Sequence, residues 1–64
     1  MDKLQDLIID ALNDGINKKA LLIVTQMDEE QFDLYVEYNK FSSYDSRIIR
    51  QLIKEWREGK WRRL

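Results

Sequence analysis

A single small hydrophobic core has to hold this chain together, because the chain has 64 residues and no cysteine. A chain of this length buries only about 60% of the surface that its unfolded form exposes, which is enough for one core. Disulfides are excluded, and with histidine also absent the usual zinc ligands are missing. We therefore expect one domain over residues 1–64, without a metal or a cofactor.

The composition is that of a soluble globular protein, with 44% hydrophobic and 36% charged residues. No apolar run approaches the roughly 18 residues that cross a bilayer. The first residues, MDKLQDLIIDALNDG, lack the basic start and the continuous apolar stretch of a secretory signal. We expect a cytoplasmic protein with no membrane association.

The chain has no proline and only two glycines, so helix ends must be predicted mainly from capping residues. A first helix is predicted with Asp2 as N-cap, Gln5 three residues later, and Gly15 at its end. A second is expected from Asn17, as N-cap, to about Gln26. The helical spacing of the first segment places these apolar residues on one face: Leu4, Leu7, Ile8, Ala11 and Leu12.

The clearest helix start in the chain is at Asp28, a favourable N-cap with Gln31 three residues later. A third helix is expected to continue to about Asn39. The same region also alternates apolar and polar residues and is rich in β-branched and aromatic side chains, as a strand would be. The alternative is therefore a β-hairpin formed by residues 20–26 and 32–38.

A turn over residues 41–45 precedes the last helix, which we expect to begin with Asp45 as N-cap and to reach about Glu58. Gly59 is a natural helix end, and residues 60–64 form a basic tail beyond it. The segments together predict an all-α fold of three or four helices. With the hairpin, the alternative is an α-β-hairpin-α fold.

Charge is divided unevenly along the chain. Residues 1–41 hold four lysines against nine acids, a net charge of −5, whereas residues 42–64 hold seven lysines and arginines against three acids, a net charge of +4. In the predicted last helix, four cations fall within about 80° of one another. Such a stripe can contact a phosphate backbone or an acidic protein surface. The alternative is that these are ordinary solvated cations, which the helix dipole favours near a C-terminus.

Two candidate binding surfaces follow from this distribution. The first is basic and comprises Arg47, Arg50, Lys54, Arg57, Lys60, Trp61, Arg62 and Arg63. The second is acidic and comprises Glu29, Glu30, Asp33 and Glu37. Trp61 is an interface anchor among cations or, alternatively, folds back over the core, where Trp56 is expected.

The residue types of an active site are largely missing. The chain has no histidine, no cysteine and little volume for a pocket, so we expect no catalytic residues. The acids around Glu29 start a predicted helix, where they stabilise the positive end of its dipole without any catalytic role. Neither the spacing of an EF-hand nor a glycine-rich phosphate loop is present.

The segment from Lys18 to Tyr35 resembles a helix-turn-helix in the order of its apolar positions. These positions are Leu21 and Leu22 in the first helix, Met27 in the turn, and Phe32 and Tyr35 in the second helix. The segment departs from that pattern at Gln26, where a turn glycine is favoured, and in its acidic second helix, which would repel DNA. The resemblance implies either a module that binds protein or one whose DNA contact passes to the basic last helix.

The bipolar charge predicts a non-enzymatic small regulatory protein that acts through protein-protein binding. Anti-repressors, inhibitors and adaptors encoded by phages and mobile elements are of this kind. One alternative is a DNA-associated regulator of transcription or recombination that places residues 47–63 on phosphates, although the pI of about 5.3 counts against it. Another is a self-associating module such as a homodimer, in which a second copy completes the small core.

Overall fold

The fold is all-helical over residues 3–59, the part of the chain that a computed structural model describes. The helices are α1 (Leu4–Asn13), α2 (Lys18–Thr25), α3 (Glu29–Tyr38) and α4 (Ser43–Arg57). The predicted all-α fold is confirmed. The hairpin alternative is wrong, because both of its strands fall within α2 and α3, and Asp28 starts a helix between them.

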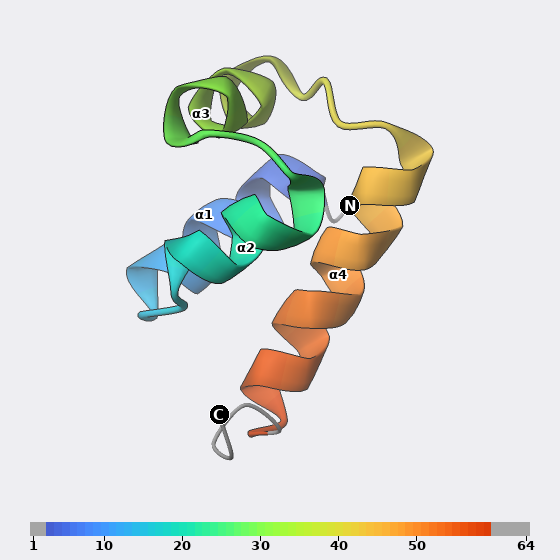
Figure 1. The fold of residues 1–64 in the computed structure, drawn as a ribbon. Coiled ribbons are helices and arrows are strands. Elements are labelled where there is room, and N and C mark those ends of the chain that lie inside the picture. The colour runs from blue at the N-terminus through green and yellow to red at the C-terminus, as the bar shows by residue number, and fades with distance from the viewer. Residues whose placement is uncertain (1–2, 60–64) are drawn as a thin grey trace.

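Helix α4 is the longest element and organises the packing. It packs against both α1 and α2, while α3 packs against α1 (Figure 1). All four helices and the α1–α2 connection contribute to one buried cluster. Its members are Leu4, Ile8, Ala11, Ile16, Leu21, Phe32, Ile49 and Ile53.

Two helix starts use the capping residues predicted for them. The Asn17 side chain accepts a hydrogen bond of 3.0 Å from the backbone N–H of Lys19 at the start of α2. The Asp28 side chain accepts one of 2.7 Å from the backbone N–H of Gln31 at the start of α3. Each bond satisfies a donor that has no partner within its own helix.

The other two starts differ from the prediction. Asp45 does not cap α4, because the helix begins three residues earlier and Ser42 Oγ accepts a 3.1 Å hydrogen bond from the Asp45 N–H. Asp45 lies in the first turn, where its charge faces the positive end of the helix dipole. Helix α1 has Lys3 at its N-cap position without a side-chain hydrogen bond. The predicted cap, Asp2, lies outside the described residues.

A residue with positive φ follows each of the four helices, although the chain has only two glycines. Gly15 and Gly59 follow α1 and α4 with φ of 105° and 81°. Helices α2 and α3 end instead on Gln26 and Asn39, which have φ of 59° and 53°. Gln26 thus takes the conformation that a turn glycine normally takes in a helix-turn-helix, and a short connection separates α2 from α3.

Phe41 fixes the position of the connection between α3 and α4. Its ring lies 5.4 Å from the Phe32 ring and 5.5 Å from the Tyr35 ring, measured between centroids. These tilted and edge-on contacts hold the connection against α3. Within residues 3–59, none of the helices combines the length and the apolar character that crossing a membrane requires.

Candidate functional site

Helix α4 separates an inward apolar face from an outward basic one. Ile49 and Ile53 are fully buried, whereas Arg47, Arg50 and Lys54 are exposed. The two sets lie on opposite sides because a helix turns by about 100° per residue. Burial of the isoleucines against α1 and α2 therefore leaves Arg47 and Lys54 on the outward side of α4, with Arg50 at the edge beside α1.

The outward face carries a shallow groove, which we call the α4 groove. It has a volume of about 540 Å³ and is lined by Phe41, Ser43, Ser46, Arg47, Arg50, Gln51 and Lys54. None of the described residues that line it carries a carboxylate. The groove thus combines three positive charges, two hydroxyls and an amide with one aromatic ring.

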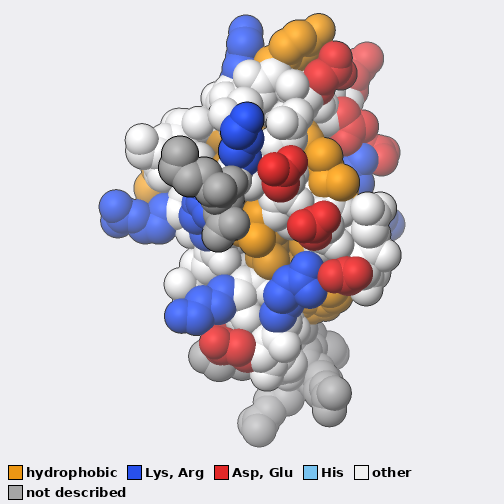
Figure 2. All heavy atoms as spheres, turned by 180° about the vertical axis from the view of Figure 1, so that it is seen from behind, with side chains coloured by type: hydrophobic (Ala, Val, Ile, Leu, Met, Phe, Trp, Pro, Cys, Tyr) orange, Lys and Arg blue, Asp and Glu red, His pale blue; other side chains and the backbone are white. Residues whose placement is uncertain are grey.

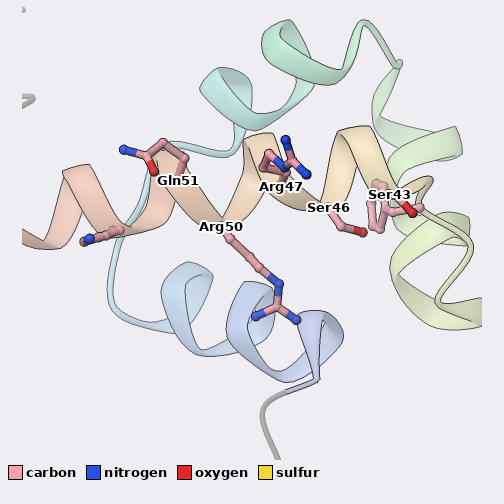
Figure 3. A pocket seen from close by; sticks show the side chains of 7 residues that line it. Ser43, Ser46, Arg47, Arg50 and Gln51 are labelled. Carbon is pink, nitrogen blue, oxygen red and sulfur yellow. The ribbon is translucent and has the colours of Figure 1, made fainter.

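The side chains of the α4 groove are spread along the helix rather than pointing to one spot. In Figure 3, Arg47 and Arg50 leave α4 on different sides, and Arg50 extends over the first turn of α1. Ser43 and Ser46 lie near the start of the helix. The Gln51 amide is oriented by a 2.8 Å hydrogen bond from its Nε2 to Glu55. This geometry is suited to an elongated ligand, not to a single small ion.

Arg57, which was predicted to belong to the basic surface, pairs with an acid of the same molecule instead. Arg57 Nη2 lies 3.0 Å from Asp14 Oδ2, and the Arg57 guanidinium lies 5.2 Å from the centroid of the Trp56 ring. Its charge is therefore partly neutralised within the molecule, and Arg57 does not line the α4 groove. Trp56 itself is half-buried and packs against the core. The four remaining basic-surface candidates lie outside the described residues: Lys60, Trp61, Arg62 and Arg63.

The predicted acidic surface divides into two pairs. Lys18 Nζ lies 3.0 Å from Glu29 Oε2 and 2.7 Å from Asp33 Oδ1, so these two acids are engaged with α2. The hydrogen bond to Asp33 is the main reason why the pKa of the Lys18 ammonium is raised above its usual 10.5. Desolvation opposes this rise, and the hydrogen bond to Glu29 adds a smaller increase. Glu30 and Glu37 are exposed on the outer side of α3.

Two apolar side chains accompany the second pair of acids. Leu34 is 49% exposed and Tyr38 is 60% exposed, one turn apart on α3. On a helical wheel they share a face about 100° wide with Glu30 and Glu37. We call these four residues the α3 outer face. The Lys40 ammonium lies 6.0 Å from the centroid of the Tyr38 ring, at one end of this face.

The charge asymmetry of the sequence is visible on the surface. Figure 2 shows most of the acidic side chains of this view at the upper right and down the centre, and most of the basic ones toward the left. Helix α1 adds exposed Asp6 and Asp10 and has no lysine or arginine of its own. The basic α4 groove therefore belongs to a molecule in which α1 and α3 present acids.

Sequence reasoning missed several residues of this site. Ser43 and Ser46 were detectable in principle, because residues 43, 47, 50 and 54 recur at helical spacing and only the position of the N-cap hid them. Gln51 was detectable in the same way, because it follows Arg47 by four residues on the helix. The place of Phe41 carries no such signal, since it depends on how Phe41 packs on α3. The same holds for Lys18, whose ion pairs require α2 and α3 to be brought together.

Residues 3–59 contain no group of three or more Asp or Glu side chains placed to hold a metal ion. No protein-family model matches the chain, and neither a curated protein nor a solved structure matches it significantly. What the chain binds must therefore be inferred from the chemistry of its surface.

Proposed function

We propose that this chain is a non-enzymatic regulatory protein that binds an acidic segment of a partner protein in the α4 groove. The observation that carries the proposal is the lining of that groove, where the exposed cations Arg47 and Lys54 stand seven residues apart on α4 and none of the described lining residues is an acid. Guanidinium and ammonium groups donate charge-assisted hydrogen bonds to carboxylates, which are shorter and stronger than neutral ones. An acidic segment lying along α4 would meet these donors in succession.

The neutral residues of the groove support the same kind of ligand. The hydroxyls of Ser43 and Ser46 offer further donors near the start of α4, and Phe41 offers an apolar contact. A segment that carries both acids and an apolar side chain would use all of these contacts. Since the charges are exposed, they contribute more to association rate and specificity than to affinity.

Acids elsewhere on this small molecule favour a protein partner over duplex DNA. Asp14 neutralises Arg57, and exposed Asp6 and Asp10 lie on α1, which packs directly against α4. The molecule measures only 32 × 28 × 22 Å, so a duplex on α4 would come close to these acids. At physiological salt, charges are screened beyond about 8 Å, so the acids that lie within that distance of the duplex would repel it. A narrow peptide can contact the groove alone.

The proposal is tested by fluorescence anisotropy with a labelled acidic helical peptide that carries leucines along one face and glutamates beside them. We expect binding at about 50 mM salt that weakens at about 200 mM. The double variant Arg47→Gln, Lys54→Gln should weaken binding by about tenfold, the equivalent of about 1.4 kcal/mol. The matched control is Lys3→Gln, Lys19→Gln, which removes two exposed cations outside the groove and should bind as the wild type does.

Two results would contradict this proposal. One is the absence of peptide binding at the lower salt concentration, and the other is an equal loss of binding in the control variant. A labelled DNA duplex is titrated in parallel. Tighter binding of the duplex than of the peptide, lost in Arg47→Gln, Lys54→Gln, would favour the alternative of a DNA-associated regulator.

A further inference from the structure

The α3 outer face of this chain matches the α4 groove in spacing and in charge. Glu30 and Glu37 are seven residues apart on α3, and Arg47 and Lys54 are seven residues apart on α4. At 1.5 Å per residue, both separations correspond to about 10.5 Å along a helix. Two such helices lying side by side would place an acid opposite a base at both ends of the contact.

The residues between these charges are also compatible. Leu34 lies between Glu30 and Glu37 on the α3 outer face, and Tyr38 follows one turn later; both are about half exposed. In the α4 groove, Phe41 provides an aromatic surface and Gln51 a neutral side chain between the two cations. The contact would therefore bury apolar surface as well as pair charges, which exposed ion pairs alone do not achieve.

A single chain cannot make this contact with itself. Helix α3 packs against α1, and the connection over residues 39–42 is short and is held to α3 by the contacts of Phe41. The α3 outer face and the α4 groove both lie on the outside of the molecule, on two helices that each pack against α1 and not extensively against each other. The matching surfaces can therefore meet only between two molecules.

We propose that the α4 groove of one copy binds the α3 outer face of a second copy. The net charge of −1 leaves little overall repulsion between copies. The contact joins two different surfaces, so a pair of copies still has one unoccupied α4 groove and one unoccupied α3 outer face, and further copies can bind there. Repeated contacts form a closed ring if the rotation from copy to copy adds up to a full turn, and an open filament if it does not. This inference goes beyond the proposed function, because it holds whether or not an external partner exists.

Sedimentation velocity at several protein concentrations tests the inference. We expect the average mass to rise with concentration at about 50 mM salt and to fall to that of the 7.8 kDa monomer at about 300 mM. A face variant, Glu30→Gln, Glu37→Gln, and a groove variant, Arg47→Gln, Lys54→Gln, should each be monomeric. Circular dichroism checks that each variant is folded.

The decisive sample is an equal mixture of the two variants at about 50 mM salt. The face variant keeps an intact groove and the groove variant keeps an intact α3 face, so together they can form one contact and no more. We expect a heterodimer at twice the monomer mass, with no larger species. The matched control, Lys3→Gln, Lys19→Gln, removes two exposed charges that belong to neither surface and should associate as the wild type does.

A wild-type protein that stays monomeric at about 50 mM salt and millimolar concentration would overturn the inference. So would a mixture that stays monomeric although the wild type associates. The two proposals fail separately, because the face variant retains the α4 groove. If this variant binds the acidic peptide but does not pair with the groove variant, self-association is wrong and the proposed function stands.

Discussion

Lys18 Nζ lies 2.7 Å from Asp33 Oδ1, an ion pair that connects the first residue of α2 to the middle of α3. A second carboxylate, from Glu29, lies 3.0 Å from the same ammonium. The Lys18 side chain is 28% exposed, so it is partly shielded from water. One cation thus links α2 and α3 across their connection.

Replacing this cation should destabilise the fold slightly. Lys18→Met keeps the length of the side chain but removes the charge, and we expect it to lower the free energy of unfolding at pH 7 by about 1 kcal/mol or less. Urea denaturation followed by circular dichroism measures the change. Lys19→Met, at an exposed position of the same helix, is the matched control and should have a smaller effect. An equal loss in both variants would show that the pairs with α3 contribute nothing.

The contribution of Lys18 should also depend on pH. Because the pKa of Lys18 is raised in the folded protein, first by its hydrogen bond to Asp33, folding favours the protonated form. The stabilisation is therefore complete below pH 10.5, the ordinary value, and is lost as pH rises through the raised pKa. The difference in unfolding free energy between wild type and Lys18→Met should be constant from pH 7 to about 9 and shrink above about 10.5. A difference that grew with pH would contradict this assignment.

Because Ser42 and not Asp45 caps α4, replacing Ser42 should destabilise the protein more than replacing Asp45. Ser42→Ala removes the hydrogen-bond acceptor for the Asp45 N–H and should cost about 1 kcal/mol of unfolding free energy. Asp45→Ala loses a favourable charge near the helix dipole but gains helix propensity, so we expect a net change of about 0.5 kcal/mol or less. Thermal unfolding of both variants shows which substitution lowers the stability more. A larger loss in Asp45→Ala would mean that α4 starts later than the structure has it.

Gln26 is exposed and has left-handed backbone, which costs a non-glycine residue about 1–2 kcal/mol. Gln26→Gly relieves that strain, and the greater freedom of glycine in the unfolded chain offsets about 0.4–1 kcal/mol of the gain. We expect a net stabilisation of up to about 1.5 kcal/mol. Asn39→Gly, at the corresponding end of α3, should gain less, because asparagine tolerates this conformation better than glutamine does. Chemical denaturation of both variants compares the two ends, and an equal or larger gain at Asn39 would be inconsistent with backbone strain at Gln26.

Phe32 is the largest fully buried side chain of the core. Phe32→Ala should cost about 3–5 kcal/mol. A domain of this size has a total stability of roughly 3–10 kcal/mol, so we expect the variant to be largely unfolded at 25 °C by circular dichroism. Tyr44→Ala is the control, since Tyr44 is also aromatic but is 72% exposed. A folded Phe32→Ala with near-wild-type stability would show that the core does not depend on this ring.

The fold was predictable where local signals agreed. Asn17 and Asp28 were identified as caps because a short polar side chain preceding an apolar helical pattern has few other roles. The start of α4 was missed because Ser42 and Asp45 are both good caps, and their sequence does not say which one hydrogen-bonds to the backbone. Competition between similar local signals is resolved by the burial of the whole helix, which the sequence alone does not contain.

The candidate site was predictable only in part. The spacing of Arg47, Arg50 and Lys54 placed them together on one helix face, since helical geometry alone determines that relation. The α4 groove itself was not predictable, because Phe41 lines it only as a result of packing on α3. The ion pair between Arg57 and Asp14 was not predictable either, because these residues are far apart in the chain.

The sequence by itself determined the helical class, most helix boundaries and the basic face of α4, since each depends on contacts within a few residues. The tertiary structure decided which charges are neutralised within the molecule and which stay exposed on its surface. Lys18 is drawn to α3 and Arg57 to α1, while Arg47 and Lys54 remain at the surface in the α4 groove. The physical reason is that ion pairs act over a few ångströms. Whether two charges come that close depends on how the helices pack to bury residues such as Phe32, Ile49 and Ile53.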